Sequence, residues 1–254
     1  MKPSGNTILM TGGGSGIGAA LAQRFHDEGN AVIVAGRRKD ALDHACEGRA
    51  SMHAMTLDIE SAVAIDAFAQ EIVAKFPALN IVVNNAGIMR SERLESRRDL
   101  ADAETTIATN LLGPIRMTNS LVDHLVAQPD AAIVNVSSGL AFVPMFTTPT
   151  YNATKAAIHS YTLSLREALK GKVEVIELAP PGVQTGLTPG QETRAGYQPL
   201  GEFIDEVMAL FNQQPTPQEI VVPRARLLRS AEAEGRFDAA FEALSDLARK
   251  ARGD

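Results

Sequence analysis

Short apolar, β-branched runs alternate along this chain with longer segments of helical periodicity. Several of the short runs are apolar throughout, as strands covered on both faces must be. Alternation of this kind predicts an α/β fold with a doubly wound parallel sheet, right-handed crossovers and helices on both faces. The predicted strands are 7–10, 31–35, 52–57, 81–84, 131–136 and 173–179, and the predicted helices are 17–28, 62–76, 103–127 (one helix or two pieces) and 151–170.

Composition limits the class of protein. The chain has 254 residues, 45% of them apolar and 21% charged, which suits a globular protein with a sizeable core. A net charge of −6 gives no reason to expect nucleic acid or an anionic membrane as a partner. The single cysteine, Cys46, excludes an internal disulfide and a cysteine-built metal site. No stretch has the length and apolarity of a signal peptide or a membrane span, so a cytoplasmic location is expected.

No repeat and no linker divides the chain, so residues 1–254 are expected to form one domain. After residue 179 the alternation gives way to chain containing proline and glycine, up to Pro223. We expect residues 186–222 to form a lid over the substrate. The stretch 231–249 has the period of an amphipathic helix, which we expect to pack or to contact another subunit.

A glycine-rich turn follows the first predicted strand and precedes the first predicted helix. Its sequence is Thr-Gly-Gly-Gly-Ser-Gly-Ile-Gly at 11–18, and it allows two registers for a dinucleotide fingerprint, one of them Gly14-x-Gly16-x-x-Ala19. Glycines let a phosphate approach the backbone, and the positive end of the following helix attracts it. The turn therefore predicts a dinucleotide site in a Rossmann-like domain, formed by Gly12, Gly14, Ser15, Gly16, Ile17 and Gly18.

The second predicted strand indicates which dinucleotide binds. An acidic residue about 20 positions after the glycines would bind the ribose hydroxyls of NAD. The strand ends instead in Arg37 and Arg38, whose guanidinium groups suit a 2′-phosphate. We therefore expect NADP(H) rather than NAD(H). The alternative is that the two arginines only solvate the start of a helix.

Tyr151 and Lys155 are four residues apart at the start of a predicted helix. This spacing places the phenol and the ammonium group on one helix face. A nearby cation favours the phenolate and could lower the phenol pKa from about 10 by ~1–3, which would make an acid/base group. Taken alone, the spacing is also common in surface pairs.

These motifs together resemble the short-chain dehydrogenase/reductase family, in its compact form of roughly 250 residues. The motifs occur in family order: the glycine turn at 11–18, Asn-Asn-Ala-Gly at Asn84–Gly87, then Asn110, Ser138, Tyr151 and Lys155. The resemblance extends from residue 7 to about residue 187. It implies an NAD(P)-dependent oxidoreductase acting on a CH-OH group, without a metal.

The resemblance also implies a role for each matched position. Asp58 would contact the adenine, and Asn85, Ala86 and Gly87 would support the sheet and line the adenosine ribose. Asn110 would distort its helix and hold a water in a proton relay. Ser138 would orient the substrate oxygen, while Ser137 would be structural. Tyr151 would donate or accept the proton, and Lys155 would lower its pKa and bind the nicotinamide ribose.

Alternatives remain for several residues. Asp58 could cap the helix at 62–76 instead of, or as well as, contacting adenine. Asn110 and Ser138, considered without the family, would be an ordinary helix residue and a turn former. The five histidines match no motif. Arg90, Arg93, Arg97 and Arg98 could select an anionic substrate, although a solvated loop explains them more simply.

The family pattern Pro-Gly-x-Val-x-Thr is altered after the sixth predicted strand, because Pro181 replaces the glycine. Proline fixes φ and removes a donor, so the path of this loop is expected to differ. Val183 and Thr185 are still expected beside the nicotinamide. The substrate walls are expected to come from 186–214 and from 139–150, including Leu140, Phe142, Val143, Met145 and Phe146.

The predicted reaction is reversible hydride transfer between NADP(H) and a carbonyl or alcohol substrate. A non-catalytic NADP(H) sensor or scaffold is the alternative, and an epimerase or dehydratase that oxidises its substrate transiently is another. The resemblance also suggests a homodimer or homotetramer joined through residues 100–127 and 151–170. The identity of the substrate does not follow from the sequence.

Overall fold

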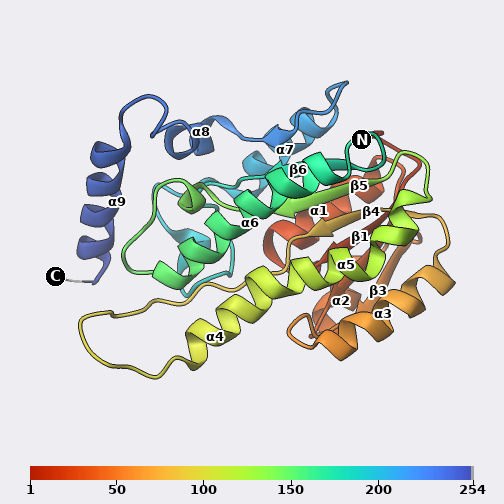
Figure 1. The fold of residues 1–254 in the computed structure, drawn as a ribbon, viewed down its shortest axis with the longest axis horizontal. Coiled ribbons are helices and arrows are strands. Elements are labelled where there is room, and N and C mark those ends of the chain that lie inside the picture. The colour runs from red at the N-terminus through yellow and green to blue at the C-terminus, as the bar shows by residue number, and fades with distance from the viewer. Residues whose placement is uncertain (253–254) are drawn as a thin grey trace.

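The computed structural model describes residues 1–252, which form a parallel sheet of seven strands between two layers of helices (Figure 1). The strand order is β3-β2-β1-β4-β5-β6-β7, so the order of the strands reverses between β1 and β4. The predicted doubly wound, Rossmann-like fold is confirmed. The strands are β1 (Thr7–Thr11), β2 (Ala31–Gly36), β3 (Met52–Thr56), β4 (Leu79–Asn84), β5 (Ala132–Val136), β6 (Glu174–Leu178) and β7 (Glu219–Ile220).

Alternate residues of the strands feed two cores. In β1, Ile8 and Met10 pack on one face of the sheet and Leu9 on the other, as the pleat requires. The first face is covered by α1 (Gly16–Asp27), α2 (Lys39–Cys46) and α7 (Leu200–Phe211), and the second by α3 (Ala62–Lys75), α5 (Gly113–Val126) and α6 (Pro149–Ala168). The remaining helices are α4 (Ala101–Ile107), α8 (Pro223–Arg229) and α9 (Phe237–Arg252).

The six predicted strands and four predicted helical stretches all occur, with ends shifted by a few residues. The stretch predicted at 103–127 is continuous but contains a π-helical turn, Ala108–Leu112, between α4 and α5. A π-turn adds one residue to the helical repeat and is often found at functional sites. Asn110 lies in the middle of this turn.

The expected lid at 186–222 is wrong for its second half. The side chains of Phe203, Val207 and Phe211 in α7 are fully buried, and the Phe211 ring packs edge-on against Phe25 of α1 with centroids 5.4 Å apart. The helix α7 therefore belongs to the core, and Glu219–Ile220 form the edge strand β7. Only residues 186–199 remain at the mouth of the site described below.

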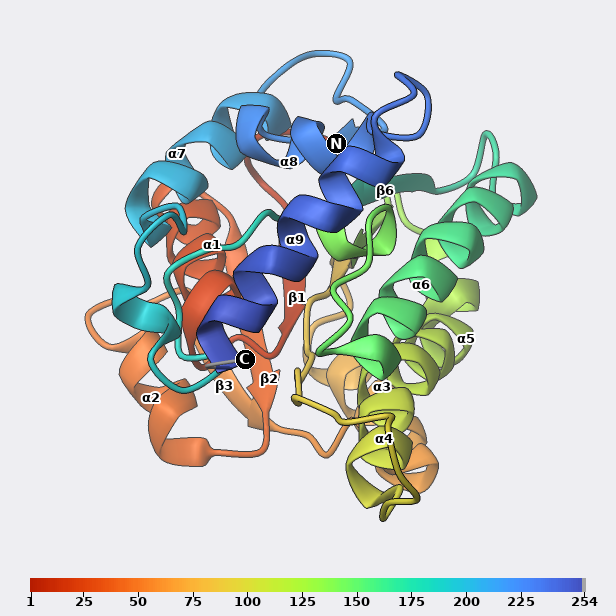
Figure 2. The same ribbon diagram turned by 90° about the vertical axis from the view of Figure 1, so that its left-hand side faces the viewer.

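The last helix also begins later than predicted. Gly235 has φ +66°, a left-handed conformation that ends the preceding turn, so α9 starts at Phe237 rather than at residue 231. Figure 2 shows α9 in front of the ends of the strands. None of the helices in residues 1–252 has the length and apolarity needed to cross a membrane.

Candidate active site

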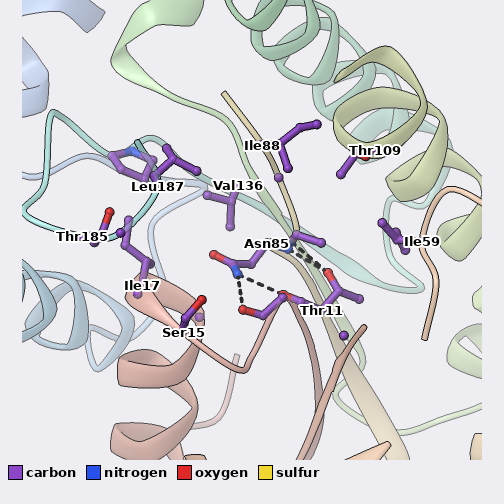
Figure 3. A pocket seen from close by; sticks show the side chains of 18 of the residues that line it. Thr11, Ser15, Ile17, Ile59, Asn85, Ile88, Thr109, Val136, Thr185 and Leu187 are labelled. Carbon is purple, nitrogen blue, oxygen red and sulfur yellow. Dashed lines mark hydrogen bonds between the residues drawn. The ribbon is translucent and has the colours of Figure 1, made fainter. Parts of the chain in front are cut away.

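A cavity of about 470 Å³ opens at the carboxyl ends of the central strands, beside the point where the strand order reverses (Figure 3). Open α/β sheets bind their ligands in this crevice. Its walls come from the turn after β1, the end of β2, the segments that follow β3 and β4, the end of β5, α6 and the loop after β6. No group of three or more His, Cys, Asp or Glu side chains suited to a metal ion occurs within residues 1–252.

The glycine turn adopts one of the two possible registers. A Cβ atom on Gly18 would lie 2.4 Å from the Gly12 carbonyl oxygen, and Gly12 itself has φ +67°. A Cβ on Gly14 would meet only ordinary contacts at 3.4 Å. Gly16 has φ +53°, so the three glycines of Thr-Gly-x-x-x-Gly-x-Gly are constrained, and Gly13 is constrained as well, because its Cβ would lie 2.7 Å from Val34. Ser15, Gly16, Ile17 and Gly18 line the cavity, whereas Gly14 does not.

The start of α1 leaves backbone donors available to a ligand. Ser15 is the N-cap residue, and its side chain makes no capping hydrogen bond. The first N–H groups of a helix lack partners within that helix and carry its positive partial charge. This end of α1 faces the cavity and can therefore receive an anion.

The turn after β4 is fixed against the glycine turn. Asn85 Nδ2 donates to the Thr11 carbonyl oxygen at 2.9 Å, and the Asn85 and Ala86 nitrogens both donate to Thr11 Oγ1, at 3.0 and 3.1 Å (Figure 3). A Cβ on Gly12 would lie 2.8 Å from Ala86 Cα. The two turns thus form one packed unit, and Asn85, Ala86 and Gly87 line the cavity.

Arg37 and Arg38 both line the cavity at the end of β2. Arg37 forms an ion pair with Glu60, with 2.9 Å between Nη1 and Oε1. Arg38 is the N-cap residue of α2 and caps it without a side-chain hydrogen bond. Both arginine side chains are therefore exposed at the border of the cavity.

Asp58 is not among the residues that line this cavity. Its Oδ1 accepts a hydrogen bond from the Glu60 nitrogen at 3.1 Å, and the side chain is exposed beside a shallow hollow that Arg37 shares. The alternative helix-cap role is wrong, because Ser61 is the N-cap of α3 and accepts from the Ala64 nitrogen. No contact of Asp58 in the structure supports its predicted role in binding adenine.

Tyr151 and Lys155 lie in the first two turns of α6, and both are buried. Lys155 Nζ lies 5.6 Å from the centre of the Tyr151 ring and donates to the Val136 carbonyl oxygen at 2.8 Å. Ser138 follows β5, and its Oγ accepts from the Leu140 nitrogen at 3.1 Å. The phenol, the ammonium group and the hydroxyl thus meet at one wall of the cavity.

Burial is the main cause of the pKa shifts of Tyr151 and Lys155. It raises the pKa of Tyr151 to about 12, although a hydrogen bond with Ser138 opposes the rise and the nearby Tyr197 phenol adds to it. Burial also lowers the pKa of Lys155 to about 8. The expected lowering of the phenol pKa by Lys155 is therefore wrong for this structure, because desolvation raises the pKa and Lys155 is not among the groups that lower it. Near neutral pH the phenol holds its proton.

Asn110 connects the π-turn to the segment that leaves β4. Its Oδ1 accepts from the Ile88 nitrogen at 2.9 Å, and its Nδ2 donates to the Ile88 carbonyl oxygen at 2.8 Å. Nδ2 also approaches Thr154 Oγ1, at 3.3 Å. The side chain is buried and does not line the cavity. Its hydrogen bonds to Ile88 hold the segment after β4 next to Lys155.

The loop after β6 brings Val183 and Thr185 to the cavity in spite of Pro181. A short parallel bridge pairs Val183 with Gln198. Gln191 Nε2 donates to the Val183 carbonyl oxygen at 2.8 Å and to Thr185 Oγ1 at 3.2 Å. Gln191 is buried and lines the cavity, and it was missed because a lone glutamine in a loop gives no sequence signal.

The segment 139–150, expected as a substrate wall, does not contribute its predicted apolar side chains to this cavity. None of Leu140, Phe142, Val143, Met145 and Phe146 lines the cavity. Phe142 instead packs against His159 and lies under Arg229, and Phe146 lies under two arginines of α9. The apolar residues that line the cavity include Ile88, which follows β4, and Leu187, which follows β6.

Known proteins share this sequence pattern and this fold. The sequence model of the short chain dehydrogenase family matches residues 6–195. The chain is 37% identical over 249 residues to the uncharacterized oxidoreductase DltE of Bacillus subtilis (96% of this chain, 98% of the relative). It is 33% identical to sulfoacetaldehyde reductase 2 of Chromohalobacter salexigens (71% of this chain, 74% of the relative).

Among solved structures, the closed form of a serine dehydrogenase complexed with NADP+ superposes with a TM-score of 0.74 at 25% identity, covering 82% of this chain and 89% of that one. The family match covers well over half of the chain and includes the glycine turn, the Asn-Asn-Ala-Gly turn and the Tyr151–Lys155 pair. The chain therefore belongs to the short-chain dehydrogenase/reductase family of oxidoreductases.

Proposed function

We propose that this enzyme transfers hydride between NADP(H) and a small carbonyl or alcohol compound, with Tyr151 as the general acid or base. The observation that carries the proposal is the group formed by Ser138, Tyr151 and Lys155 at one wall of a cavity whose other end is the glycine turn. A buried phenol that keeps its proton near neutral pH suits the donor role in carbonyl reduction.

The cavity suits a nicotinamide dinucleotide. The glycine turn offers a surface without side chains, where a Cβ at Gly12 or Gly18 would collide with backbone, and the start of α1 offers free N–H groups for a pyrophosphate. When bound, this cofactor supplies or accepts the hydride. Val183, Thr185 and Lys155 would hold its nicotinamide end.

The residues of the chain supply positioning and a proton. Ser138 Oγ and Tyr151 Oη would donate hydrogen bonds to the carbonyl oxygen, which stabilises the negative charge that develops there. Tyr151 Oη then gives up its proton. Lys155 would keep a positive charge beside the phenol, and Asn110 would keep the Ile88 segment in place next to Lys155.

Preference for NADP(H) over NAD(H) rests on Arg37 and Arg38. Both border the cavity at the strand where an NAD enzyme would carry a carboxylate. Arg38 is the stronger candidate for the 2′-phosphate, because Arg37 already pairs with Glu60. The NADP+ complex of the serine dehydrogenase supports the same choice.

The first experiment is a titration with NADPH and NADH followed by nicotinamide fluorescence, with Arg37→Ala and Arg38→Ala beside the parent protein. We expect tighter binding of NADPH, and Arg38→Ala should lose most of that preference. Turnover is then measured at 340 nm with a panel of aldehydes and ketones, with Tyr151→Phe as the control. Binding of NADPH without turnover of any compound would favour a sensor or scaffold.

We also propose that the enzyme is a homodimer or homotetramer. Leu100, Ile107 and Leu112 are exposed on and beside α4 and the π-turn, and Leu163 is exposed on α6. These apolar side chains support an interface along this side of the molecule. Light scattering on the purified protein measures the state, and Leu163→Arg should shift it toward a monomer.

A further inference from the structure

The cavity is lined by cations and by no carboxylate. Arg37, Arg38, Arg90 and Lys155 line it, and no Asp or Glu side chain of residues 1–252 does. Two of these cations follow β2, where the 2′-phosphate is proposed to bind, and Lys155 is buried on α6. Arg90 is left over. It lies on the segment that leaves β4, and the proposed cofactor contacts do not use it.

Both ends of the segment that carries Arg90 are fixed next to the reactive groups. At the first end, Asn110 holds Ile88, and a Cβ on Gly87 would lie 3.7 Å from Lys155 Nζ. At the second end, the Glu92 carboxylate accepts from the nitrogen of Thr150, the residue before Tyr151, at 2.9 Å. The segment therefore runs along the first turns of α6.

The guanidinium of Arg90 is weakly paired. Its ionic partner is Asp102 on α4, with 3.6 Å between Nε and Oδ1, and the two side chains are 49% and 70% exposed. An ion pair this exposed contributes little, so a better anion can replace it. Of the four arginines at 90–98, Arg98 pairs with the buried Glu92, and Arg93 and Arg97 do not line the cavity.

From this arrangement we infer that the substrate is a small oxo-acid whose carboxylate binds Arg90 while its carbonyl faces Ser138 and Tyr151. The guanidinium fork matches a carboxylate through two parallel hydrogen bonds. Ile88 and Leu187, which also line the cavity, suit a short carbon chain between the two polar ends. The inference rests on the proposed hydride transfer and adds the substrate class to it.

The test compares succinate semialdehyde with its methyl ester as substrates with NADPH. The parent enzyme should show a higher kcat/KM for the acid. Arg90→Gln should lower that kcat/KM about tenfold to a hundredfold, the loss typical of a charge-assisted hydrogen bond, and leave the ester unchanged. Arg93→Gln is the matched control from the same segment and should behave like the parent. Sulfoacetaldehyde as a third substrate distinguishes a sulfonate from a carboxylate.

A second measurement does not depend on turnover. Succinate, which has no carbonyl to reduce, is titrated calorimetrically into the enzyme–NADPH complex. Binding that Arg90→Gln abolishes, with NADPH affinity unchanged, supports the carboxylate site even if no aldehyde reacts. Equal kcat/KM for acid and ester, preference for sulfoacetaldehyde alone, or succinate binding that survives in Arg90→Gln overturns the inference. Succinate binding without turnover of any carbonyl overturns the proposed function instead.

Discussion

The carboxylate of Glu92 accepts two hydrogen bonds from Thr150, one from the backbone nitrogen at 2.9 Å and one from Oγ1 at 2.8 Å. Thr148, the N-cap residue of α6, makes no capping hydrogen bond with its own side chain. A residue from a distant segment therefore satisfies a free N–H group at the start of the helix that carries Tyr151. Its negative charge also lies at the positive end of that helix.

Removing this carboxylate should weaken both the fold and the site. We expect Glu92→Ala to lower the free energy of unfolding by ~1–3 kcal/mol, because the partly buried donors of Thr150 and Arg98 lose their acceptor. The kcat should fall with it, because the first turn of α6 is loosened. Urea denaturation measures the first effect. Glu95→Ala, an exposed neighbour on the same segment, is the control and should change stability by less than ~0.5 kcal/mol.

The rate of carbonyl reduction should depend on pH through Lys155 rather than Tyr151. With a pKa of about 12, the Tyr151 phenol stays protonated at every pH used in ordinary assays. The Lys155 ammonium, with a pKa of about 8, loses its charge as the pH rises through that value. We expect kcat for reduction to fall above about pH 8. Tyr151→Phe should lower kcat by ~10²–10⁴ at all pH values and leave NADPH affinity intact.

The burial of Lys155 should also change how the free energy of unfolding depends on pH. Its pKa in the folded protein, about 8, lies below the ordinary value of 10.5, so between the two values the unfolded chain binds more protons. The free energy of unfolding of the parent protein should therefore rise relative to that of Lys155→Met as the pH increases from 8 to 10.5. The relative gain should be on the order of 2–3 kcal/mol. Urea curves for both proteins at the two ends of this range measure it, and parallel curves would contradict the burial of a charged lysine.

The glycine turn offers a matched pair of substitutions. In Gly18→Ala the new methyl group would lie 2.4 Å from the Gly12 oxygen and 2.4 Å from Asn85 Nδ2 of the other turn, so the two packed turns must separate. We expect NADPH affinity to fall at least tenfold, and stability to fall by ~1–3 kcal/mol, which is typical of overpacking. Gly14→Ala places the same methyl group at ordinary contact distances of 3.4 Å. Fluorescence titration should therefore show nearly normal binding for Gly14→Ala.

Much of the fold could be predicted because the strands are short, apolar and regularly spaced. Four elements were missed, namely α2, α7, α8 and β7. The strand β7 has two residues, and α7 follows a stretch containing proline and glycine although its apolar face is buried against α1. Burial of that kind depends on the rest of the fold, which a local pattern does not contain.

Many residues of the candidate site could be predicted from the sequence, but the directions of their pKa shifts could not. The spacing of Tyr151 and Lys155 indicated that they share a helix face, and the structure has them on one wall of the cavity. The spacing carried no information about desolvation, so the direction of the phenol pKa was wrong. In the same way, four arginines between residues 90 and 98 are equivalent in sequence, and only the fold separates Arg90 from the others.

The bridge between Val183 and Gln198 closes a loop whose two ends are held by the hydrogen bonds from Gln184 to Gln198 and from Gln198 to Gly182, both 2.8 Å. Most side chains in residues 188–197 of this loop are exposed. A loop with fixed, adjacent ends can be lengthened, shortened or exchanged at small entropic cost. Such a loop can be transplanted from a relative while the sheet and the glycine turn stay unchanged, provided that Gln191 is kept to bind Val183 and Thr185.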